Sequence, residues 1–286
     1  MPARVAINGL GRIGRATLKI ILNTPELELV AVNDIAPPDN LAYLLKYDTV
    51  YGRYEREIGQ EADELLVAGS HYKVLSEKDP AKLPWGGMAI DLVFECTGVF
   101  TTKPDLEKHI QAGGKNVILS APAKGDGVAF VVHGVNQADG EHIVSCASCT
   151  TNCIAPVIEV FGRRIGLRKA IMTTVHAYTI SQSVVDGPAK KWRRGRAAAA
   201  NFVPTSTGAA QATTKALPQY EGRFDGVAIR GPVAIGSIAD ITIVAERATS
   251  VEEINAIFEE RAGSSKSRTP MERIDEAEAG RLVTGL

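Results

Sequence analysis

The feature that most constrains this chain is a glycine-rich turn near its N-terminus. A short apolar segment, residues 4–8, runs directly into Asn8-Gly9-Leu10-Gly11-Arg12-Ile13-Gly14, and apolar residues at helical spacing follow. In a strand–turn–helix unit, the first glycine permits a tight turn, the second lets the backbone approach a ligand, and the third lets the helix pack on the sheet. The pattern therefore predicts a βα unit that opens a doubly wound sheet.

A second apolar segment, residues 29–34, ends in Asp34, 20 residues beyond Gly14. A carboxylate in this position can accept hydrogen bonds from both ribose hydroxyls of an adenosine, and its charge repels a 2′-phosphate. The free N–H groups at the start of the preceding helix attract a pyrophosphate. Together these features favour an NAD site over an NADP site. The alternative is a structural βα turn followed by an ordinary aspartate.

Further strand-like segments occur at residues 90–95, 116–120 and 142–145, separated by loops and by a helix-compatible segment at 105–112. This alternation predicts a Rossmann-type, mostly parallel sheet, and we place the first domain at residues 1–148. Two of the strands end in Glu95-Cys96-Thr97-Gly98 and Ser120-Ala121-Pro122. Because such sheets bind ligands at the carboxyl ends of their strands, we expect both segments near the dinucleotide.

The second half of the sequence has longer β-rich segments, at residues 169–177, 224–230 and 240–245. A long polar loop joins the first two and has the composition of a functional loop. Ser250 and Glu253 form a capping box that opens an amphipathic helix. We therefore expect an α+β catalytic domain with a mainly antiparallel or mixed sheet over residues 149–286.

The charge balance argues against a dedicated nucleic-acid binder. The chain has 32 Lys and Arg against 33 Asp and Glu, a net charge of −1, which gives no overall attraction to polyanions. The basic run Lys190-Lys191-Trp192-Arg193-Arg194-Gly195-Arg196 is better explained as a small-anion loop with solvated or intersubunit arginines than as a nucleic-acid patch. With neither a long apolar run nor a signal peptide, we expect a cytoplasmic protein with no membrane partner.

Three of the four cysteines, Cys146, Cys149 and Cys153, lie close together in the sequence. A CxxC redox pair and a metal site are both formally possible. Neither is favoured, because no fourth ligand lies nearby and the context of a thioredoxin-like motif is missing, so we expect no metal. The third interpretation is a nucleophile at the start of a helix, where the helix dipole stabilises a thiolate. Cys149 fits this position, and Cys153, one turn further on, is expected to be buried and unreactive.

A thiolate needs a base or a cationic partner, and His176 is the best candidate among five histidines. It stands at the end of a predicted strand and precedes a polar loop, so an ion pair with Cys149 is expected. Read alone, His176 is more typical of a core histidine, and its pairing with a cysteine at a helix start reverses that preference. The other histidines are expected to be surface or packing residues (His71, His109 and His142) or to have no assigned role (His133).

Four segments together resemble the phosphorylating glyceraldehyde-3-phosphate dehydrogenase family, and the similarity extends from Arg4 to about Ala262. They are Asn8–Gly14, Ser148-Cys149-Thr150-Thr151-Asn152-Cys153, Thr174-Val175-His176-Ala177-Tyr178-Thr179 and Pro204-Thr205-Ser206-Thr207-Gly208-Ala209-Ala210. The resemblance implies that Cys149 adds to the aldehyde of glyceraldehyde 3-phosphate and that His176 takes the hydroxyl proton as hydride passes to NAD. Inorganic phosphate then displaces the thioester to give 1,3-bisphosphoglycerate, a step of glycolysis and gluconeogenesis.

The same resemblance implies further site residues and a homotetramer. The cofactor-binding residues would be Asn8, Gly9, Gly11, Arg12, Ile13, Gly14, Asp34, Lys78, Thr97, Gly98 and Ser120. The residues that bind the substrate phosphate and the attacking phosphate would be Ser148, Thr150, Thr179, Arg194, Thr207, Gly208 and Arg230.

The sequence also departs from the family. Family members continue through further strands, a Trp-Tyr-Asp-Asn-Glu stretch and a closing helix that this sequence does not contain, so we expect a truncated catalytic domain. The segment Arg230-Gly231-Pro232-Val233-Ala234-Ile235-Gly236 replaces the usual Arg-Val-Pro-Val-Pro-Thr-Gly. Two alternatives therefore stay open: an erythrose-4-phosphate dehydrogenase, and a truncated, weakly active fragment that binds NAD.

Overall fold

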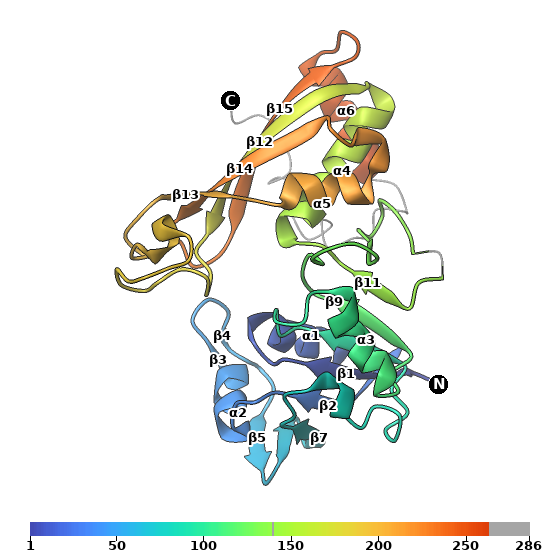
Figure 1. The fold of residues 1–286 in the computed structure, drawn as a ribbon, viewed down its shortest axis with the longest axis vertical. Helices are drawn as coiled ribbons and strands as arrows, with labels where there is room; N and C mark the ends of the chain where they lie inside the picture. The colour runs from blue at the N-terminus through green and yellow to red at the C-terminus, as the bar shows by residue number, and fades with distance from the viewer. Residues whose placement is uncertain (139, 263–286) are drawn as a thin grey trace. The chain divides into compact units, whose positions relative to one another are not determined.

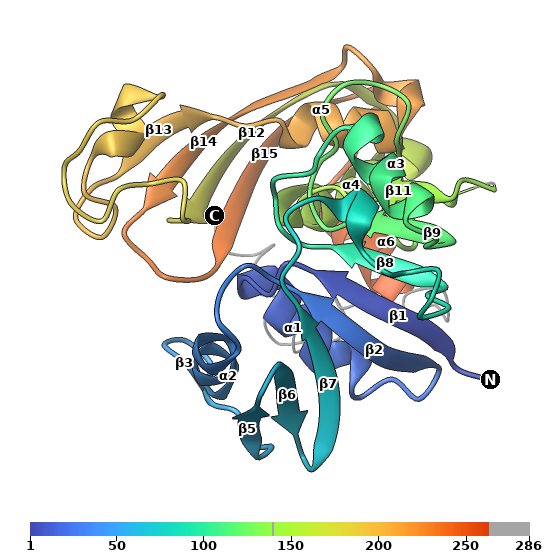
Figure 2. The ribbon, with the colours of Figure 1, turned by 60° about the horizontal axis from the view of Figure 1, so that its bottom comes forward.

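The computed structural model describes residues 1–138 and 140–262, and it divides the chain into two compact units. The first unit comprises residues 1–130 and 138–147, and the second comprises residues 131–137 and the chain from Ser148 onward. Figures 1 and 2 show the elements of each unit, which are described separately below.

The first unit is built on one nine-stranded sheet of order β10-β11-β9-β8-β1-β2-β7-β6-β5. Seven neighbouring strands run parallel, and β6 and β5 continue the sheet as an antiparallel meander. The strands are β1 (Ala3–Asn8), β2 (Leu27–Asn33), β5 (Ile58–Glu61), β6 (Glu64–Val67), β7 (Ser70–Leu75), β8 (Leu92–Glu95), β9 (Asn116–Leu119), β10 (Ala129–Phe130) and β11 (Ile143–Ser145). The other elements are α1 (Arg12–Ile21), α2 (Pro38–Lys46), α3 (Lys103–Gln111), the 3₁₀ turn η1 (Pro80–Lys82) and the small hairpin β3 (Tyr47–Asp48) and β4 (Gly52–Arg53).

The alternation of side chains along β1 explains the two apolar cores of this unit. Val5 and Ile7 face one side, where they pack with Leu18 and Ile21 of α1. Ala6 faces the other side and belongs to the cluster around Trp85, Ile90 and Val93. A strand that is buried on both faces is typical of a parallel sheet covered on both sides, which accounts for the nearly continuous apolar run at residues 5–7.

The second unit contains a four-stranded mixed sheet of order β13-β14-β12-β15. Its strands are β12 (Leu167–Ala177), β13 (Val203–Ser206), β14 (Phe224–Gly231) and β15 (Ser237–Ala245); β12 and β14 are parallel, and the other pairs are antiparallel. Helices α4 (Cys149–Arg164), α5 (Ala209–Ala216) and α6 (Val251–Ala262) cover one face of this sheet (Figure 1). The 3₁₀ turns η2 (Trp192–Gly195) and η3 (Pro218–Tyr220) complete the unit. Phe161 of α4 and Ile165, which directly follows this helix, pack in one apolar cluster with Ile257 of α6.

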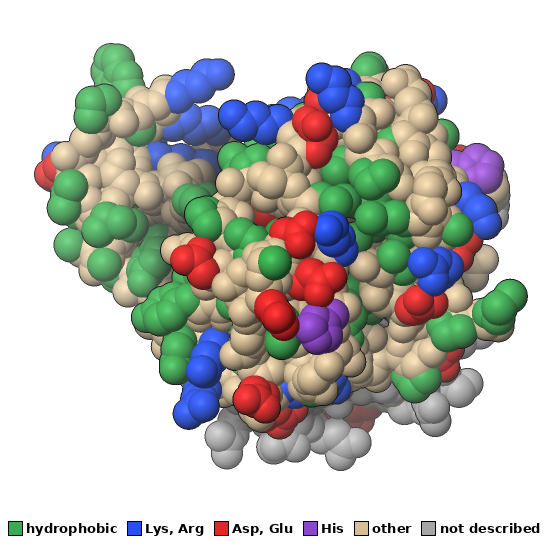
Figure 3. All heavy atoms as spheres, turned by 90° about the horizontal axis from the view of Figure 1, so that it is seen from below, with side chains coloured by type: hydrophobic (Ala, Val, Ile, Leu, Met, Phe, Trp, Pro, Cys, Tyr) green, Lys and Arg blue, Asp and Glu red, His purple; other side chains and the backbone are tan. Residues whose placement is uncertain are grey.

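The predicted fold class, a Rossmann-type sheet followed by an α+β domain with a mixed sheet, is confirmed. The antiparallel β5–β7 meander was not predicted from the sequence. Residues 263–286, which include the end of the catalytic domain that was expected to be truncated, lie outside the described residues. Among the described helices none is long and apolar enough to cross a membrane. Both signs of charge occur on the surface in Figure 3, in keeping with the net charge of −1.

The turn between β1 and α1 has almost no room for side chains. Gly9 has a φ of +92°, and a Cβ atom on Gly14 would lie only 1.9 Å from the carbonyl oxygen of Gly9. The Gly9 N–H also donates to the Asn33 carbonyl at the end of β2 (2.7 Å), so the turn cannot move away from the sheet without losing this bond. The helix start is therefore fixed tightly against the strand ends.

We expect Gly14→Ala to destabilise the protein by about 3 kcal/mol, because the new methyl group collides with rigid backbone. Chemical denaturation measures the change. The matched control is Gly59→Ala, whose Cβ would meet only the side chain of Leu66 at 3.5 Å. Equal stabilities of the two variants would contradict the close packing described here.

Candidate active site

Cys149 is the first residue of α4, and the preceding residues hold it at the helix start. Ala147 has a φ of +59°, which turns the chain sharply after β11. Ser148 is the N-cap, and its Oγ accepts a hydrogen bond from the Thr151 N–H (3.1 Å). The Cys149 side chain is exposed. An exposed thiol on the first turn of a 16-residue helix faces unpaired N–H groups and the positive end of the helix dipole.

The predicted partner His176 lies beside this thiol. It is the penultimate residue of β12, and its Nε2 is 3.3 Å from the Cys149 Sγ. The hydrogen bond from His176 is the largest influence that holds the pKa of Cys149 below its usual value. The same hydrogen bond, from the opposite side, raises the pKa of His176. Both shifts favour a thiolate–imidazolium pair, as expected for an activated cysteine.

Arg230 of β14 also contacts the histidine. The parallel register of β12 and β14 places Arg230 directly opposite His176. Its guanidinium lies 2.6 Å from His176 Nδ1 and donates to the Ala177 carbonyl (2.9 Å), which also lies 2.8 Å from Nδ1. Nδ1 can therefore accept from Arg230 or donate to the carbonyl, but not both at once. When Nδ1 carries its proton, the carbonyl holds the ring and Arg230 has a donor to spare.

Arg230 is equipped to bind an anion. Its Nε is buried and has no hydrogen-bond partner, and within the described residues no carboxylate forms an ion pair with Arg230. Burial lowers the pKa of the guanidinium, and the charge of Arg194 lowers it further. A buried donor without an acceptor is costly in a folded protein, so an anionic ligand is its natural partner.

The remaining predicted phosphate-binding residues fall into two groups. Thr179 contacts Ser181 through their hydroxyls (2.9 Å), and Ser181 in turn accepts from Arg194 (3.2 Å). Thr207 and Gly208 stand at the start of α5, a helix that packs against α4. There the Thr207 hydroxyl accepts from the Ala209 N–H (3.1 Å). Ser148 and Thr207 thus serve local helix starts, and Thr150 is buried.

The other cysteines have raised pKa values. Burial raises the pKa of Cys96 to about 11 and also raises that of Cys146. The expectation that Cys153 is buried was wrong: it is exposed on the same face of α4 as Cys149 and Asn152, because the sheet covers the opposite face. Its pKa is nevertheless raised, first by desolvation and then by Cys149. Cys149 alone has a lowered pKa, and all four thiols are free of disulfides.

The carboxyl edge of the first sheet has the features of a dinucleotide site. Gly11 caps α1 without any side-chain hydrogen bond, and the first turn of this helix has no acidic residue. A Cβ atom on Gly11 or Gly98 would meet nothing within 4 Å, so both backbones are open to a ligand. Ile13 is exposed beside them. The donor set and the open backbone therefore fit a pyrophosphate at the start of α1.

The other predicted cofactor residues lie around this turn. Asp34 accepts from the Leu10 N–H (2.6 Å) and the Ala36 N–H (2.9 Å), one on each oxygen, which leaves a lone pair on each for a ribose hydroxyl. Arg12 forms an ion pair with Asp48 of the β3–β4 hairpin (3.2 Å). Lys78 and Ser120 follow β7 and β9, and Lys78 is exposed.

Sequence reasoning missed a buried polar cluster next to this edge. His109, expected to be a surface or packing residue without polar neighbours, is fully buried. It bonds to Trp85 (3.0 Å) and to Glu95 (3.0 Å), which are also fully buried. The only signal in the sequence was that Glu95 ends an apolar strand. His109 lies 14 positions from Glu95 and 24 positions from Trp85, so local patterns could not identify these contacts.

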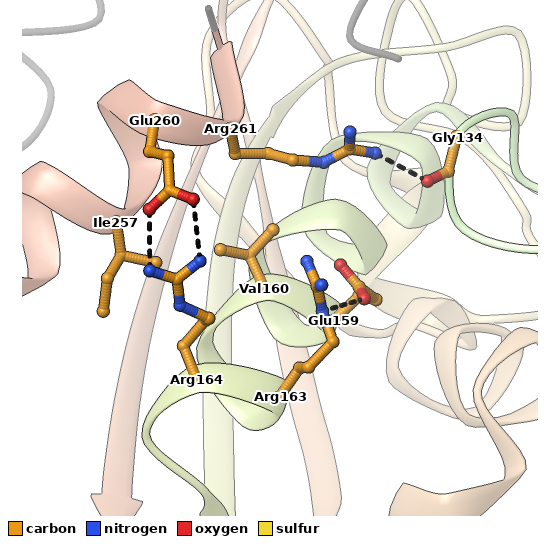
Figure 4. A pocket seen from close by; sticks show the side chains of 8 residues that line it. All are labelled: Gly134, Glu159, Val160, Arg163, Arg164, Ile257, Glu260 and Arg261. Carbon is orange, nitrogen blue, oxygen red and sulfur yellow. Dashed lines mark hydrogen bonds and ion pairs between the residues drawn. The ribbon is translucent and has the colours of Figure 1, made fainter. Parts of the chain in front are cut away.

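A cavity of about 350 Å³ lies elsewhere in the second unit, between α4 and α6, and contains neither Cys149 nor His176. Its arginines are already engaged: Arg163 with Glu159, Arg164 with Glu260, and Arg261 with the Gly134 carbonyl (Figure 4). In the part of the chain that the structure describes, no group of three His, Cys, Asp or Glu side chains could hold a metal ion.

Comparison with known proteins shows that both units match domains of the same family. The model of the glyceraldehyde 3-phosphate dehydrogenase NAD-binding domain matches residues 3–103, and the model of its C-terminal domain matches residues 148–280. This chain belongs to the glyceraldehyde-3-phosphate dehydrogenase family. It is an NAD-dependent oxidoreductase of that family, and the dinucleotide edge of the first unit is the part that matches the NAD-binding domain.

Curated relatives named glyceraldehyde-3-phosphate dehydrogenase are similar over most of this chain. The protein of Streptomyces coelicolor is 45% identical over 290 residues, covering 100% of this chain and 86% of the relative. That of Clostridium pasteurianum is 47% identical over 267 residues, covering 92% of this chain and 80% of the relative. Glyceraldehyde-3-phosphate dehydrogenase 1 of Bacillus subtilis is 44% identical over 266 residues, covering 92% and 79%.

We expect iodoacetamide to alkylate Cys149 at a lower pH than any other cysteine, because only its pKa is lowered. Peptide mapping by mass spectrometry measures the rate at each position. In His176→Ala the thiolate loses its partner, so alkylation of Cys149 at pH 7 should slow severalfold. His71→Ala, which removes an exposed histidine bonded to Glu64, should leave the rate unchanged. A pH profile of Cys149 that matched that of Cys153 would argue against the pair.

Proposed function

We propose that this chain is a phosphorylating glyceraldehyde-3-phosphate dehydrogenase that converts glyceraldehyde 3-phosphate, NAD and inorganic phosphate into 1,3-bisphosphoglycerate and NADH. One observation carries the proposal: Cys149 Sγ lies 3.3 Å from His176 Nε2, and Arg230, with a buried unpartnered donor, lies against the same imidazole. An activated thiol, a base and an anion-binding guanidinium are the groups needed to oxidise a phosphorylated aldehyde through a covalent intermediate.

The chemistry begins at sulfur. The Cys149 thiolate attacks the aldehyde carbon, the C–S bond forms, and the former carbonyl oxygen becomes the hydroxyl of a thiohemiacetal after protonation. His176 Nε2 then removes the hydroxyl proton while the C–H bond breaks. NAD, when bound, supplies the hydride acceptor for this step. The product on Cys149 is a thioester. A phosphate oxygen attacks its acyl carbon, the C–S bond breaks, and the products are an acyl phosphate and the free Cys149 thiolate.

The environment of His176 suits the role of a base. To accept a proton at Nε2, the neutral ring must carry its hydrogen on Nδ1, and the Ala177 carbonyl at 2.8 Å holds that hydrogen. In this tautomer Arg230 can no longer donate to Nδ1, so its guanidinium is available to the substrate phosphate. Binding of the anion and formation of the reactive tautomer therefore favour each other.

The other site residues are assigned by similarity of position. Thr179 and Arg230 bind the phosphate of the substrate. Ser148, Thr150, Arg194, Thr207 and Gly208 bind the attacking phosphate. The residues Asn8, Gly9, Gly11, Arg12, Ile13, Gly14, Asp34, Lys78, Thr97, Gly98 and Ser120 bind NAD, with Asp34 on the adenosine ribose.

We also place the enzyme in the cytoplasm, in glycolysis or gluconeogenesis, as a homotetramer without nucleic-acid or membrane partners. The support is the family itself together with the exposed loop at residues 180–196, which carries several apolar and basic side chains on its surface. Sedimentation velocity measures the assembly directly, and a monomeric mass would contradict the tetramer.

Absorbance at the NADH band tests the activity. We expect NADH formation with glyceraldehyde 3-phosphate, NAD and phosphate, and Cys149→Ser should lower the rate at least about a thousandfold because the nucleophile is lost. Cys153→Ser, the matched control on the same helix face, should retain the rate. A folded chain that forms no NADH would refute the proposal. Faster turnover of erythrose 4-phosphate, independent of phosphate, would assign it to the tetrose substrate.

Arg230→Ala should lower kcat/KM for glyceraldehyde 3-phosphate by about a hundredfold, because a charge-assisted contact to the substrate phosphate is lost. Unphosphorylated glyceraldehyde provides the control, since it cannot make this contact. Steady-state kinetics with both aldehydes separates the two effects. Equal losses for both substrates would mean that Arg230 acts on His176 alone and not on the phosphate.

A further inference from the structure

The fully buried carboxylate of Glu95, at the end of β8, accepts hydrogen bonds from four donors. One oxygen accepts from the backbone N–H of Thr97 (2.8 Å) and from the Thr97 hydroxyl. The other accepts from the Asn8 side-chain amide (2.6 Å) and lies 3.0 Å from His109 Nε2. Four donors match the acceptor capacity of a carboxylate, so the group is saturated by the protein alone.

Trp85 fixes the orientation of this cluster. Its indole N–H can only donate, and it donates to His109 Nδ1 (3.0 Å). His109 Nδ1 is therefore an acceptor, so the ring proton is on Nε2 and points at Glu95. If the ring proton were on Nδ1 instead, two donors would face each other at Trp85 and two acceptors would face each other at Glu95. The cluster thus has one hydrogen-bond arrangement, and it is closed to water.

The same cluster extends across three strand ends. The Asn8 side-chain carbonyl accepts from the Asn33 amide (2.7 Å) at the end of β2. The Asn33 side chain also bonds to both backbone groups of Glu77, at 2.8 and 2.9 Å, after the end of β7. Glu77 directly precedes Lys78. A chain of hydrogen bonds, buried between Glu95, Asn8 and Asn33 and partly buried at Glu77, therefore links the ends of β8, β1, β2 and β7.

Thr97 connects the buried hydrogen bonds of Glu95 to the glycine turn. A Cβ atom on Gly9 would lie 2.6 Å from the Thr97 nitrogen and 2.8 Å from its Cγ2, so the turn rests directly on this residue. The backbone adds two further ties: the Gly9 N–H donates to the Asn33 carbonyl, and the Cys96 N–H donates to the Asn8 carbonyl, both at 2.7 Å. A rotation of the Glu95 side chain would free Thr97 and Asn8 together.

We infer that Glu95 is a positioning residue for NAD: its carboxylate, held by His109 and Trp85, keeps the segments at Gly9, Asp34, Lys78 and Thr97 in the arrangement that binds the dinucleotide. The inference rests on the cofactor-binding roles proposed above. Its physical basis is that a buried hydrogen-bond network is rigid when every group is paired and costly when one pair is lost. Glu95 itself has no exposed atom with which to contact NAD.

Glu95→Gln is the direct test, because it keeps the shape and turns one acceptor oxygen into a donor that must face Thr97, Asn8 or His109. We expect the Kd of NAD, measured by calorimetry well below the melting temperature, to rise at least about tenfold. The KM for NAD should rise with it, while kcat at saturating NAD changes less. Alkylation of Cys149 without NAD should be unchanged.

Two controls separate positioning from mere stability. Glu64→Gln makes the same chemical change at a partly exposed residue of the same unit that bonds to His71, and it should leave the Kd unchanged. Leu106→Ala, in the buried face of α3, should lower the melting temperature without raising the Kd. If Glu95→Gln lowers only the melting temperature and keeps the wild-type Kd, the inference is overturned.

Trp85→Phe is the second variant, in case Glu95→Gln does not fold. It keeps a buried aromatic ring but removes the indole N–H together with part of the ring system, and the Leu106→Ala control measures what lost packing alone does to the Kd. We expect the Kd of NAD to rise about fivefold, the order of one lost neutral hydrogen bond. An unchanged Kd in this variant would overturn the inference. If the unsubstituted chain itself fails to bind NAD, the proposed cofactor site falls as well, which distinguishes the two failures.

Discussion

The contact between Cys149 and His176 sets the demands that the rest of the second unit meets. A thiolate must be stabilised without being hidden, and a long helix beginning at the sulfur does this with backbone alone. The imidazole must come from another element, and the end of β12 supplies it. The parallel neighbour β14 then brings a guanidinium level with the ring. Three separate elements thus meet at the Cys149–His176 pair, because a helix start and a strand end lie together and the register of β14 places Arg230 beside the histidine.

In the first unit, the main constraint is the burial of polar side chains at the ends of the parallel strands. Parallel strands end at a common edge, and three neighbouring strands, β1, β2 and β8, have a last residue that is both buried and polar: Asn8, Asn33 and Glu95. Such groups would destabilise the sheet without hydrogen-bond partners, and here they bond to one another and to Thr97, His109 and Glu77. The open glycine turn above them needs no side chains of its own for rigidity. The glycine turn that is open to a ligand and the buried polar side chains that hold the turn in place are therefore different groups of residues.

Local sequence patterns were sufficient for the features that depend on neighbours in the chain. The turn at residues 8–14 and the helix-start position of Cys149 follow from backbone geometry and helix electrostatics, which act over one or two turns. The His109 cluster could not be predicted in this way, because it joins residues from three separate elements. The exposure of Cys153 was misjudged for a related reason: helical spacing gives a face, but only the packing of α4 on its sheet decides which face is covered. The short β5–β6 turn uses Ala62 at positive φ, where glycine is the usual signal, and only the β6–β7 turn, with Ala68 and Gly69 at positive φ, contains a glycine. The meander was therefore not recognised.

The environments of the two tryptophans have a practical consequence. Trp85 has no exposed surface and donates to His109 within the buried polar cluster, whereas Trp192 is 89% exposed in the basic loop. An aqueous quencher reaches the second indole and not the first, so the emission that survives quenching comes from beneath the dinucleotide edge. The protein therefore has one tryptophan in each unit as an intrinsic fluorescent probe. The fluorescence of Trp85 can report on the order of the buried cluster beneath the dinucleotide edge without any added label.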